Sequence, residues 1–274
     1  MDRKNHFQIT VQSIAALVQN ANIRGFFTGK IYQGQTKKVC VPGLNCYSCP
    51  GAAGSCPIGA LQNSLSAYTF KFPCYVLGLM IFFGTVLGRM VCGFLCPFGF
   101  FQDILNRIPF PKKIKTFRGD RIFRKLKYAV LILMVIILPL ICRLTPVYCK
   151  YLCPSGTLSG ILMAFADTSL FKAFGSLFAW KACVLGMTVI ASVVISRPFC
   201  KYLCPLGAFY GLFNRVSVIQ MKCDSSKCTS CGKCADSCPM SISPPEECSS
   251  SECIRCGRCA GKCGNSAIKY TAIK

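Results

Sequence analysis

The sequence predicts an α-helical integral membrane protein of three or four spans with a small α+β domain at its C-terminal end. Three observations predict this fold class. The 274-residue chain is 53% hydrophobic and only 15% charged, with its apolar residues in long blocks. A Cys-Pro-x-Gly signature occurs four times beside these blocks, and nine cysteines crowd residues 228–263. We expect a membrane domain over 1–215 and a separate domain over 216–274.

Three apolar blocks are long enough to cross a hydrocarbon core, which needs ~20 residues: 68–88, 128–147 and 174–195. A fourth candidate, 7–27, is diluted by glutamines and asparagines, so it either spans or lies at the interface as an amphipathic helix. The block 158–169 is too short to cross, which predicts an interfacial or re-entrant helix.

The loop 107–127 carries nine Lys or Arg residues against a single acid, Asp120. The positive-inside rule makes such a loop cytoplasmic, where it can also bind anionic lipid headgroups. Alternating sides along the chain then places the cysteines of 92–96 and 200–204 inside, with 40–56 and 149–153 outside. The prediction is a multi-pass protein of a bacterial cytoplasmic membrane whose C-terminal domain lies in the cytoplasm.

The formal charge of +23 does not predict nucleic-acid binding, because no nucleic-acid-binding motif accompanies the basic residues. Bound iron–sulfur clusters and their thiolates would also offset part of this charge. The odd count of 23 cysteines, in close groups, favours cluster ligation over a disulfide framework. We therefore expect no nucleic-acid partner.

Three of the four signatures have a second cysteine four residues earlier, giving Cys-x3-Cys-Pro pairs. Proline suits the first turn of a helix, so the second cysteine lies at a helix N-terminus, where backbone amides favour a thiolate. A [4Fe–4S] cubane needs four thiolates and each pair supplies two. The two inner pairs are therefore predicted to hold one cluster at the cytoplasmic edge: Cys92, Cys96, Cys200 and Cys204.

Both inner pairs follow an arginine by three residues, Arg89 and Arg197. Each arginine is interpreted either as a positive-inside anchor or as a charge that tunes the cluster. Asp103 and Asp167, near the two membrane faces, are candidates for proton exchange, the alternative being solvated interfacial acids.

The outer side offers the pair Cys149 and Cys153 together with an N-terminal group, Cys40, Cys46, Cys49 and Cys56. That group could hold a cluster alone, or give two thiolates to a second membrane-face cluster shared with the outer pair. The repeat favours sharing, with Cys49 and Cys56 as donors. A core ~30 Å thick would separate the two membrane-face clusters, so a quinone or a partner's cofactor is expected to bridge them.

The C-terminal domain contains the bacterial two-cluster ferredoxin spacing, in which the fourth cysteine of each motif ligates the other cluster. A structural zinc site needs only paired ligands and does not call for this crowded arrangement. The first expected ligand set is Cys228, Cys231, Cys234 and Cys263, and the second is Cys253, Cys256, Cys259 and Cys238. Cys223 and Cys248 are interpreted as small packing residues or spare thiols.

The Cys-x3-Cys-Pro pairs, the Arg-x2-Cys-Gly-Phe-Leu-Cys-Pro-Phe-Gly stretch at 89–99 and the double ferredoxin motif resemble the NapH-type membrane polyferredoxins. That family includes the quinol-oxidising subunit of periplasmic nitrate reduction and the iron–sulfur half of the nitrous oxide reductase regulator. The resemblance covers 68–274, and the segment 40–50 resembles a subset of anaerobe members. It implies electron transfer between the quinone pool and a protein redox partner through [4Fe–4S] clusters.

What the sequence lacks narrows the mechanism. A single histidine, His6, precludes a haem with two histidine ligands from this chain, and there is no nucleotide-binding fingerprint. The chain is therefore expected to be an electron-transfer subunit of an oxidoreductase system, with a partner on the ferredoxin domain and a possible second partner outside. The alternatives are a maturation or redox-sensing membrane protein that serves a partner metalloenzyme, and an anchor whose clusters only stabilise the fold.

Overall fold

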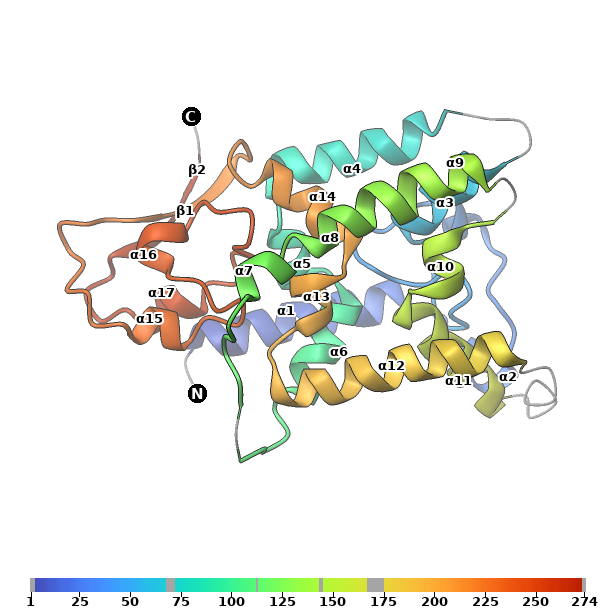
Figure 1. Cartoon of the computed structure of the whole chain (residues 1–274), viewed down its shortest axis with the longest axis horizontal. Helices are drawn as coiled ribbons and strands as arrows, with labels where there is room; N and C mark the ends of the chain where they lie inside the picture. The colour runs from blue at the N-terminus through green and yellow to red at the C-terminus, as the bar shows by residue number, and fades with distance from the viewer. Residues whose placement is uncertain (1–2, 68–71, 112, 143–144, 167–174, 273–274) are drawn as a thin grey trace.

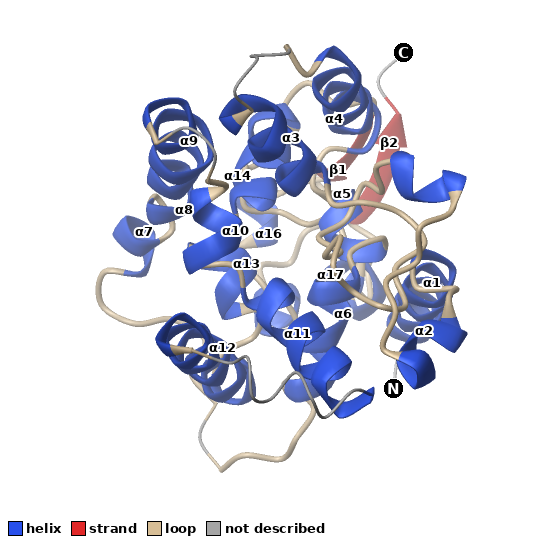
Figure 2. Cartoon of the chain, turned by 90° about the vertical axis from the view of Figure 1, so that its right-hand side faces the viewer, coloured by secondary structure: helices blue, strands red, loops and turns tan. Residues whose placement is uncertain are grey.

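Four long helical segments run along the long axis of the molecule (Figure 1). The computed structural model describes residues 3–67, 72–111, 113–142, 145–166 and 175–272. The long segments are α1 (Arg3–Gln19), α4 (Cys74–Leu87), the continuous run of α8 (Leu126–Ala129), η2 (Val130–Ile137, with π-helical geometry) and α9 (Leu138–Ile141), and α12 (Ser176–Val194). Seen end-on, they stand around the periphery and enclose shorter helices (Figure 2).

The enclosed helices follow the cysteine repeats. They are α3 (Pro57–Ser66), α5 (Met90–Phe94), α6 (Pro97–Leu105), α10 (Val147–Tyr151), α11 (Pro154–Ala166), α13 (Pro198–Tyr202) and α14 (Pro205–Phe213). The prediction that a helix starts at the proline after each cysteine is confirmed for all four repeats. Each Cys-x3-Cys pair therefore lies at the bend between two short helices.

The C-terminal domain occupies one end of the molecule (Figure 1). Its only sheet among the described residues is an antiparallel pair, β1 (Ile219–Cys223) and β2 (Ile268–Ala272), with Ile219 opposite Ala272. Between the strands lie α15 (Lys233–Asp236), α16 (Pro244–Glu247) and α17 (Arg258–Lys262). Elsewhere, α2 (Ile23–Thr28), η1 (Gln35–Lys38) and α7 (Asp120–Phe123) are short connecting helices.

Helix α1 has its polar side turned inward. Gln8 and Gln19 are buried and donate to backbone carbonyls between Cys92 and Cys96, at 3.1 Å to Gly93 and 2.6 Å to Leu95. The glutamines that dilute the apolar pattern of 7–27 therefore hold the helix against the interior. Its exposed large side chains are apolar: Phe7, Ile14, Leu17 and Val18.

Within the described residues, α12 is the one helix long and apolar enough to cross a membrane. Helix α4 has 14 residues and α11 has 13. The expected spans 68–88 and 128–147 extend into 68–71 and 143–144, which lie outside the described residues. Three or four spans therefore stay a prediction.

Buried charges join the C-terminal domain to the helical body. Glu252 accepts from Lys127 at 2.6 Å and from Arg89 at 3.2 Å, while Asp103 accepts from Arg197 at 2.7 Å and from Arg258 at 2.8 Å. Lys127, Arg89 and Arg197 have side chains that are 0% exposed. These cations lie inside the molecule, so the interpretation of Arg89 and Arg197 as anchors at lipid headgroups is wrong.

Candidate iron–sulfur sites

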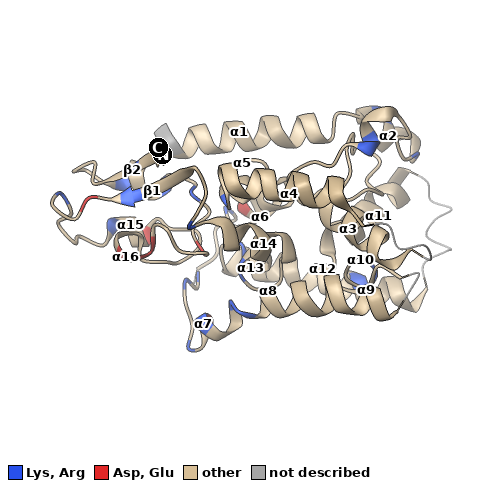
Figure 3. Cartoon of the chain, turned by 90° about the horizontal axis from the view of Figure 1, so that it is seen from above, with Lys and Arg blue, Asp and Glu red and all other residues tan. Residues whose placement is uncertain are grey.

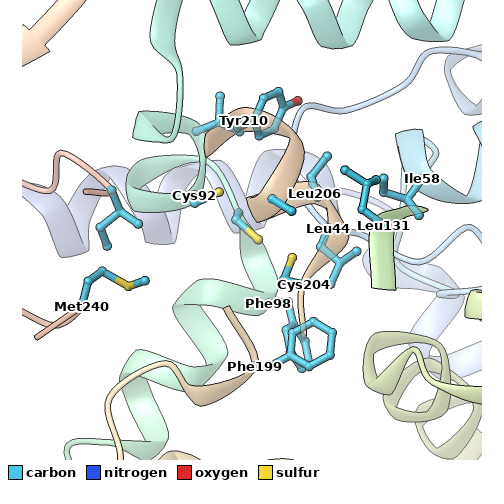
Figure 4. Close-up of a cluster of buried hydrophobic side chains, with 14 of the residues drawn as sticks. Leu44, Ile58, Cys92, Phe98, Leu131, Phe199, Cys204, Leu206, Tyr210 and Met240 are labelled. Carbon is cyan, nitrogen blue, oxygen red and sulfur yellow. The ribbon is translucent and has the colours of Figure 1, made fainter. Parts of the chain in front are cut away.

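The second and fourth repeats meet in the buried core. Cys92 and Cys204 lie close together beside Tyr210, Leu206 and Leu44 (Figure 4). Burial, followed by the neighbouring Cys96, raises the pKa of the Cys200 thiol to about 12. Burial also raises the pKa of Cys204, with further contributions from the other three thiols. We call this group the inner site: Cys92, Cys96, Cys200 and Cys204.

The inner site is braced reciprocally by the two arginines. Arg197 donates to the carbonyl of Cys92 at 2.7 Å, and Arg89 donates to the carbonyl of Cys200 at 3.3 Å. Each repeat thus contributes an arginine that holds the other repeat's first cysteine. The two buried cations also place positive charge beside the thiols, which would stabilise the negative charge of a cluster.

Helix N-termini point backbone amides at the same site. The sulfurs of Cys96 and Cys204 cap α6 and α14 and accept from the amides of Gly99 and Gly207, both at 3.4 Å. Gln102 adds a side-chain donor, with its Nε2 3.2 Å from the sulfur of Cys200. Hydrogen bonds of this kind favour the charged form of a sulfur ligand.

The first and third repeats meet at the opposite end of the bundle. A cavity of about 570 Å³ is lined by the thiols that we call the outer site: Cys46, Cys56, Cys149 and Cys153. Burial, followed by the charge of Cys46, raises the pKa of Cys153 to about 11. Gln62 accepts from the amide of Cys149 at 3.1 Å, as Gln102 accepts from the amide of Phe199 at 3.2 Å.

The expected outer donor pair is corrected by the structure. Cys46 accompanies Cys56 in the cavity, and Cys49 does not line it. The amide of Cys49 donates to the carbonyl of Cys46 at 3.0 Å in a tight turn, which directs the Cys49 thiol to Asn20 Oδ1 at 3.7 Å. Cys40 also lies apart, with its sulfur 3.5 Å from Ser55 Oγ. Neither Cys40 nor Cys49 is therefore placed to complete the outer site.

The ferredoxin motifs exchange their fourth cysteines in space. One cavity, of about 330 Å³, is lined by Cys228, Cys231, Cys234 and Cys263. A second, smaller cavity is lined by Cys238, Cys253, Cys256 and Cys259. The two residues interpreted as spare thiols line these cavities as well, Cys223 the first and Cys248 the second.

Two tyrosines fill the interval between the inner and outer sites. Both are 0% exposed, and the pKa of each is raised first by burial and then by cysteines of both sites: Cys153 and Cys204 act on Tyr148, and Cys92 and Cys56 act on Tyr210. Leu44 lines the outer cavity while its amide contacts Cys96. The expected bilayer-wide gap is therefore wrong, because the repeats fold into the bundle instead of ending at its two surfaces.

The inner site also adjoins the second ferredoxin motif. A methyl group added at Gly93 would lie 2.5 Å from the carbonyl oxygen of Ile254 and 3.7 Å from the Cα of Cys256. Helix α5 therefore packs directly on the loop of the second ferredoxin motif. The four cysteine groups follow one another from the C-terminal domain to the opposite end of the bundle.

The residues present fit iron–sulfur clusters. The Tyr148 hydroxyl is buried without a hydrogen-bond partner among the described residues, and cluster sulfurs in the flanking sites would supply acceptors. No three His, Cys, Asp or Glu side chains in the described part of the chain are close enough to hold a single metal ion. A cubane needs a wider set, since each thiolate binds a different iron, whereas one zinc with ~2.3 Å bonds needs sulfurs about 3.8 Å apart.

Comparisons with known proteins independently indicate [4Fe–4S] binding. A sequence model described as a 4Fe–4S binding domain matches 75–117, 126–169 and 176–222, and a second of the same description matches 224–242. The ferredoxin-type protein NapH of Haemophilus influenzae is 26% identical over 59% of this chain and 51% of its own length. The chain belongs to the NapH-type polyferredoxin family.

Two further relatives match this NapH-type protein at a similar identity and over a similar share of each chain. The methylamine utilization ferredoxin-type protein MauN of Paracoccus denitrificans is 27% identical over 67% of this chain and 60% of its own length. An uncharacterized protein of Methanocaldococcus jannaschii is 31% identical over 57% of this chain and 54% of its own length. The chain thus spans just over half the length of the curated relatives it matches. No solved structure matches it.

The candidate proton-exchange residues have a different environment from the one expected. Burial disfavours the charged form of Asp103, but the guanidinium groups of Arg197 and Arg258 outweigh it and lower the pKa of this carboxyl. Asp103 is only 5% exposed, so it is neither a solvated acid nor placed to exchange protons near neutral pH. Asp167 lies outside the described residues.

Proposed function

We propose that this NapH-type protein relays electrons through four [4Fe–4S] clusters, between a redox partner on the C-terminal domain and the opposite end of the bundle. The observation that carries the proposal is that four groups of cysteines follow one another in space from the C-terminal domain to the opposite end of the bundle. The proposed ligands are the inner site, the outer site and the two ferredoxin sets described above. Bound clusters would supply one-electron redox chemistry, and the protein would hold them, exclude water and set their potentials.

The proposed environment is a bacterial cytoplasmic membrane with the C-terminal domain in the cytoplasm. Lipid contact is supported by large apolar side chains exposed along three of the long segments: Tyr75, Ile81, Phe82, Ile132, Leu133, Ile136, Ile137, Leu140, Ile141, Leu177, Trp180, Met187 and Ile190. With the apolar outer side of α1, they make an outward apolar band of the kind that contacts a membrane or a partner. The inward-turned glutamines of α1 are consistent with a lipid-facing exterior.

Topology is a direct test of this environment. Reporter fusions after Arg118 and after Lys274 should both be cytoplasmic, because the 107–127 loop is strongly basic. A fusion near Ser159 should be external. If the loop proves external, the side of the membrane assigned to each cysteine group and to the C-terminal domain is reversed as well.

Metal content tests the number of clusters. Four cubanes with four irons each predict about sixteen iron and sixteen sulfide atoms per chain in the anaerobically purified protein. A value near eight would leave only the two ferredoxin clusters. Content near twelve would show that either the inner or the outer site does not hold a cluster.

An apolar cavity supports a quinone as one reactant. Its volume is about 590 Å³, and it lies between α1, α6 and α11 with Pro97, Cys49 and Asn20 in its lining. Pro97 directly follows Cys96, so a ring in this cavity would lie beside the inner site. Exposed apolar residues at its edge, Leu17 and Ile23, provide a lipid-side entrance.

Filling that cavity tests the quinone assignment. Ala16→Trp should block cluster reduction by a short-chain quinol while leaving reduction by dithionite intact, because Ala16 lines the cavity. Val18→Trp is the matched control, since Val18 lies on the same helix but is 65% exposed and does not line the cavity. Equal quinol reduction in both variants would place the quinone elsewhere.

The relay itself is tested in sealed vesicles that contain trapped ferricyanide. Dithionite added outside should bleach the ferricyanide when an ionophore compensates the charge, because electrons can then cross through the clusters. Cys183→Ser, at an exposed cysteine outside the four groups, should leave the rate unchanged. Reducible clusters without any bleaching would reject the relay and favour the maturation or redox-sensing alternative.

A further inference from the structure

Around the outer site, every charged residue that the structure describes is basic. The described segments 20–67, 145–166 and 175–181 contain no acidic residue. Among the residues that Figure 3 colours by charge, no Asp or Glu lies at this end, while acidic residues gather at the C-terminal domain. The basic residues here are Arg24, Lys30, Lys37, Lys38, Lys150 and Lys181.

These charges belong to the same packed unit as the outer site. Helix α2, which carries Arg24, packs against the loop after Cys49, because Asn22 donates to the carbonyl of Pro50 at 2.8 Å. Lys37 is buried and lies 4.9 Å above the Tyr47 ring, which places its exposed neighbour Lys38 beside the same loop. Arg24, Lys30 and Lys38 are exposed and make the basic rim.

The outer cavity adjoins this basic rim, because Tyr47, which lines the cavity, packs under Lys37, the neighbour of Lys38. Its lining includes Tyr47 and Ser48, which are both exposed, next to the half-exposed Cys46. Lys181 lines the same cavity and adds a positive charge beside Cys149 and Cys153. An electron on a cluster held at the outer site would therefore have a short path to the surface at Tyr47 and Ser48, beside the rim.

The surface of the C-terminal domain differs from the basic rim, because it exposes acidic residues. Asp224, Asp236 and Glu246 are exposed there among lysines, so its surface carries mixed charge. Complementary charge accelerates the encounter of two proteins and suppresses wrong partners. The two ends of the proposed relay therefore select partners of different charge.

From this arrangement we propose that the basic rim docks an acidic electron-transfer protein, which exchanges one electron with the cluster at the outer site. The inference rests on the proposed relay. The transfer is a single outer-sphere step: one cluster loses an electron and the cofactor of the partner gains it, or the reverse. No bond forms or breaks.

The test uses one haem protein in two forms that have opposite surface charge. Cytochrome c is basic, and succinylation of its lysines makes it acidic. The dithionite-reduced full-length protein should reduce the succinylated form faster at low ionic strength, with a rate that falls as salt is added. The triple variant Arg24→Glu, Lys30→Glu, Lys38→Glu should slow that reaction at least tenfold, consistent with the range of steering effects.

The control variant carries the same charge change at the other end, Lys222→Glu, Lys227→Glu, Lys269→Glu, and should retain the steered rate at the outer end. Docking is overturned if the two cytochromes react equally, or if the rim and control variants slow the reaction equally. Docking is also overturned if the rim variant binds anionic vesicles less tightly but reacts with the succinylated cytochrome at the wild-type rate. The rim would then contact lipid and not a protein.

A binding measurement separates docking from the relay. Oxidised succinylated cytochrome c should bind the oxidised protein, and the rim variant should abolish that binding without any electron transfer. Cys149→Ser should leave binding intact and stop the steered electron transfer. If binding persists and the Cys149→Ser variant still transfers electrons at the full rate, docking stands and the outer cluster is not the donor.

Discussion

Replacing Cys204 with serine is expected to remove one cluster and to stop electron transfer along the whole protein. The inner site lies between the ferredoxin motifs and the outer site, so its loss breaks the relay at the middle. Iron content should fall from about sixteen to about twelve atoms per chain. In the sealed-vesicle assay the bleaching rate should fall to that of empty vesicles.

The same experiment tests whether the two inner repeats share one cluster. Cys96→Ser should remove the same low-temperature paramagnetic resonance signal as Cys204→Ser and spare the ferredoxin signals. Cys183→Ser should keep all signals, because this thiol is exposed and outside the four groups. Two different lost signals would mean that each pair ligates its own centre, and the shared inner cluster would be abandoned.

The sequence carries enough information to predict which repeats pair. Cysteine ligands are local in the ferredoxin motifs, and the matching Arg-x2-Cys-x3-Cys-Pro frames at 89–97 and 197–205 mark two equivalent ends. The structure brings together the predicted thiols of the inner site and of the two ferredoxin sets, but at the outer site it places Cys46 rather than Cys49 beside Cys56. Whether they bind clusters stays a prediction until metal analysis is done.

The choice between Cys46 and Cys49 could not be predicted, because it depends on a turn. Both lie in one short loop, 40–50, and the bond from the Cys49 amide to the Cys46 carbonyl closes a turn that separates the two thiols. The pairing of the first repeat with the third did have a signal in the sequence. A glutamine stands six residues after the cysteine in both the Cys56 and the Cys96 repeat, and each glutamine accepts from a backbone amide of the partner repeat.

The prediction of a bilayer-wide distance between the inner and outer sites was wrong for a different physical reason. A hydropathy argument assumes that apolar segments cross the membrane from face to face and that cysteines lie at the ends. Here the segments after the cysteines are short helices that fold back between the long ones. Polar residues in such a bundle face inward, so Gln8 and Arg197 satisfy buried groups that the hydropathy pattern cannot reveal.

The buried ion pair between Asp103 and Arg197 should contribute more to stability than any exposed pair. Asp103→Ala would leave two guanidinium groups, those of Arg197 and Arg258, without their carboxylate. Removing one partner of a buried pair costs about 3–5 kcal/mol, so we expect that loss in the free energy of unfolding. Chemical unfolding followed by the visible absorbance of the clusters would measure it.

The matched control is Asp236→Ala. Asp236 also joins the C-terminal domain to the body, through Lys115 at 2.7 Å, but the two side chains are 79% and 56% exposed. An exposed pair contributes about 0–1 kcal/mol, because solvent screens it and both side chains must be ordered. Equal losses in the two variants would show that burial does not decide the strength of this junction.

The pH dependence has a definite sign. The folded-state pKa of Asp103 is lowered, so its contribution to stability is fully present above the unfolded pKa of about 3.9 and is lost as the pH falls through the folded value. The difference in unfolding free energy between wild type and Asp103→Ala should therefore be constant from neutral pH down to the ordinary carboxyl range. It should shrink only in stronger acid. A difference that already disappears between pH 7 and 5 would mean that Arg197 and Arg258 do not hold this carboxylate charged in the folded protein.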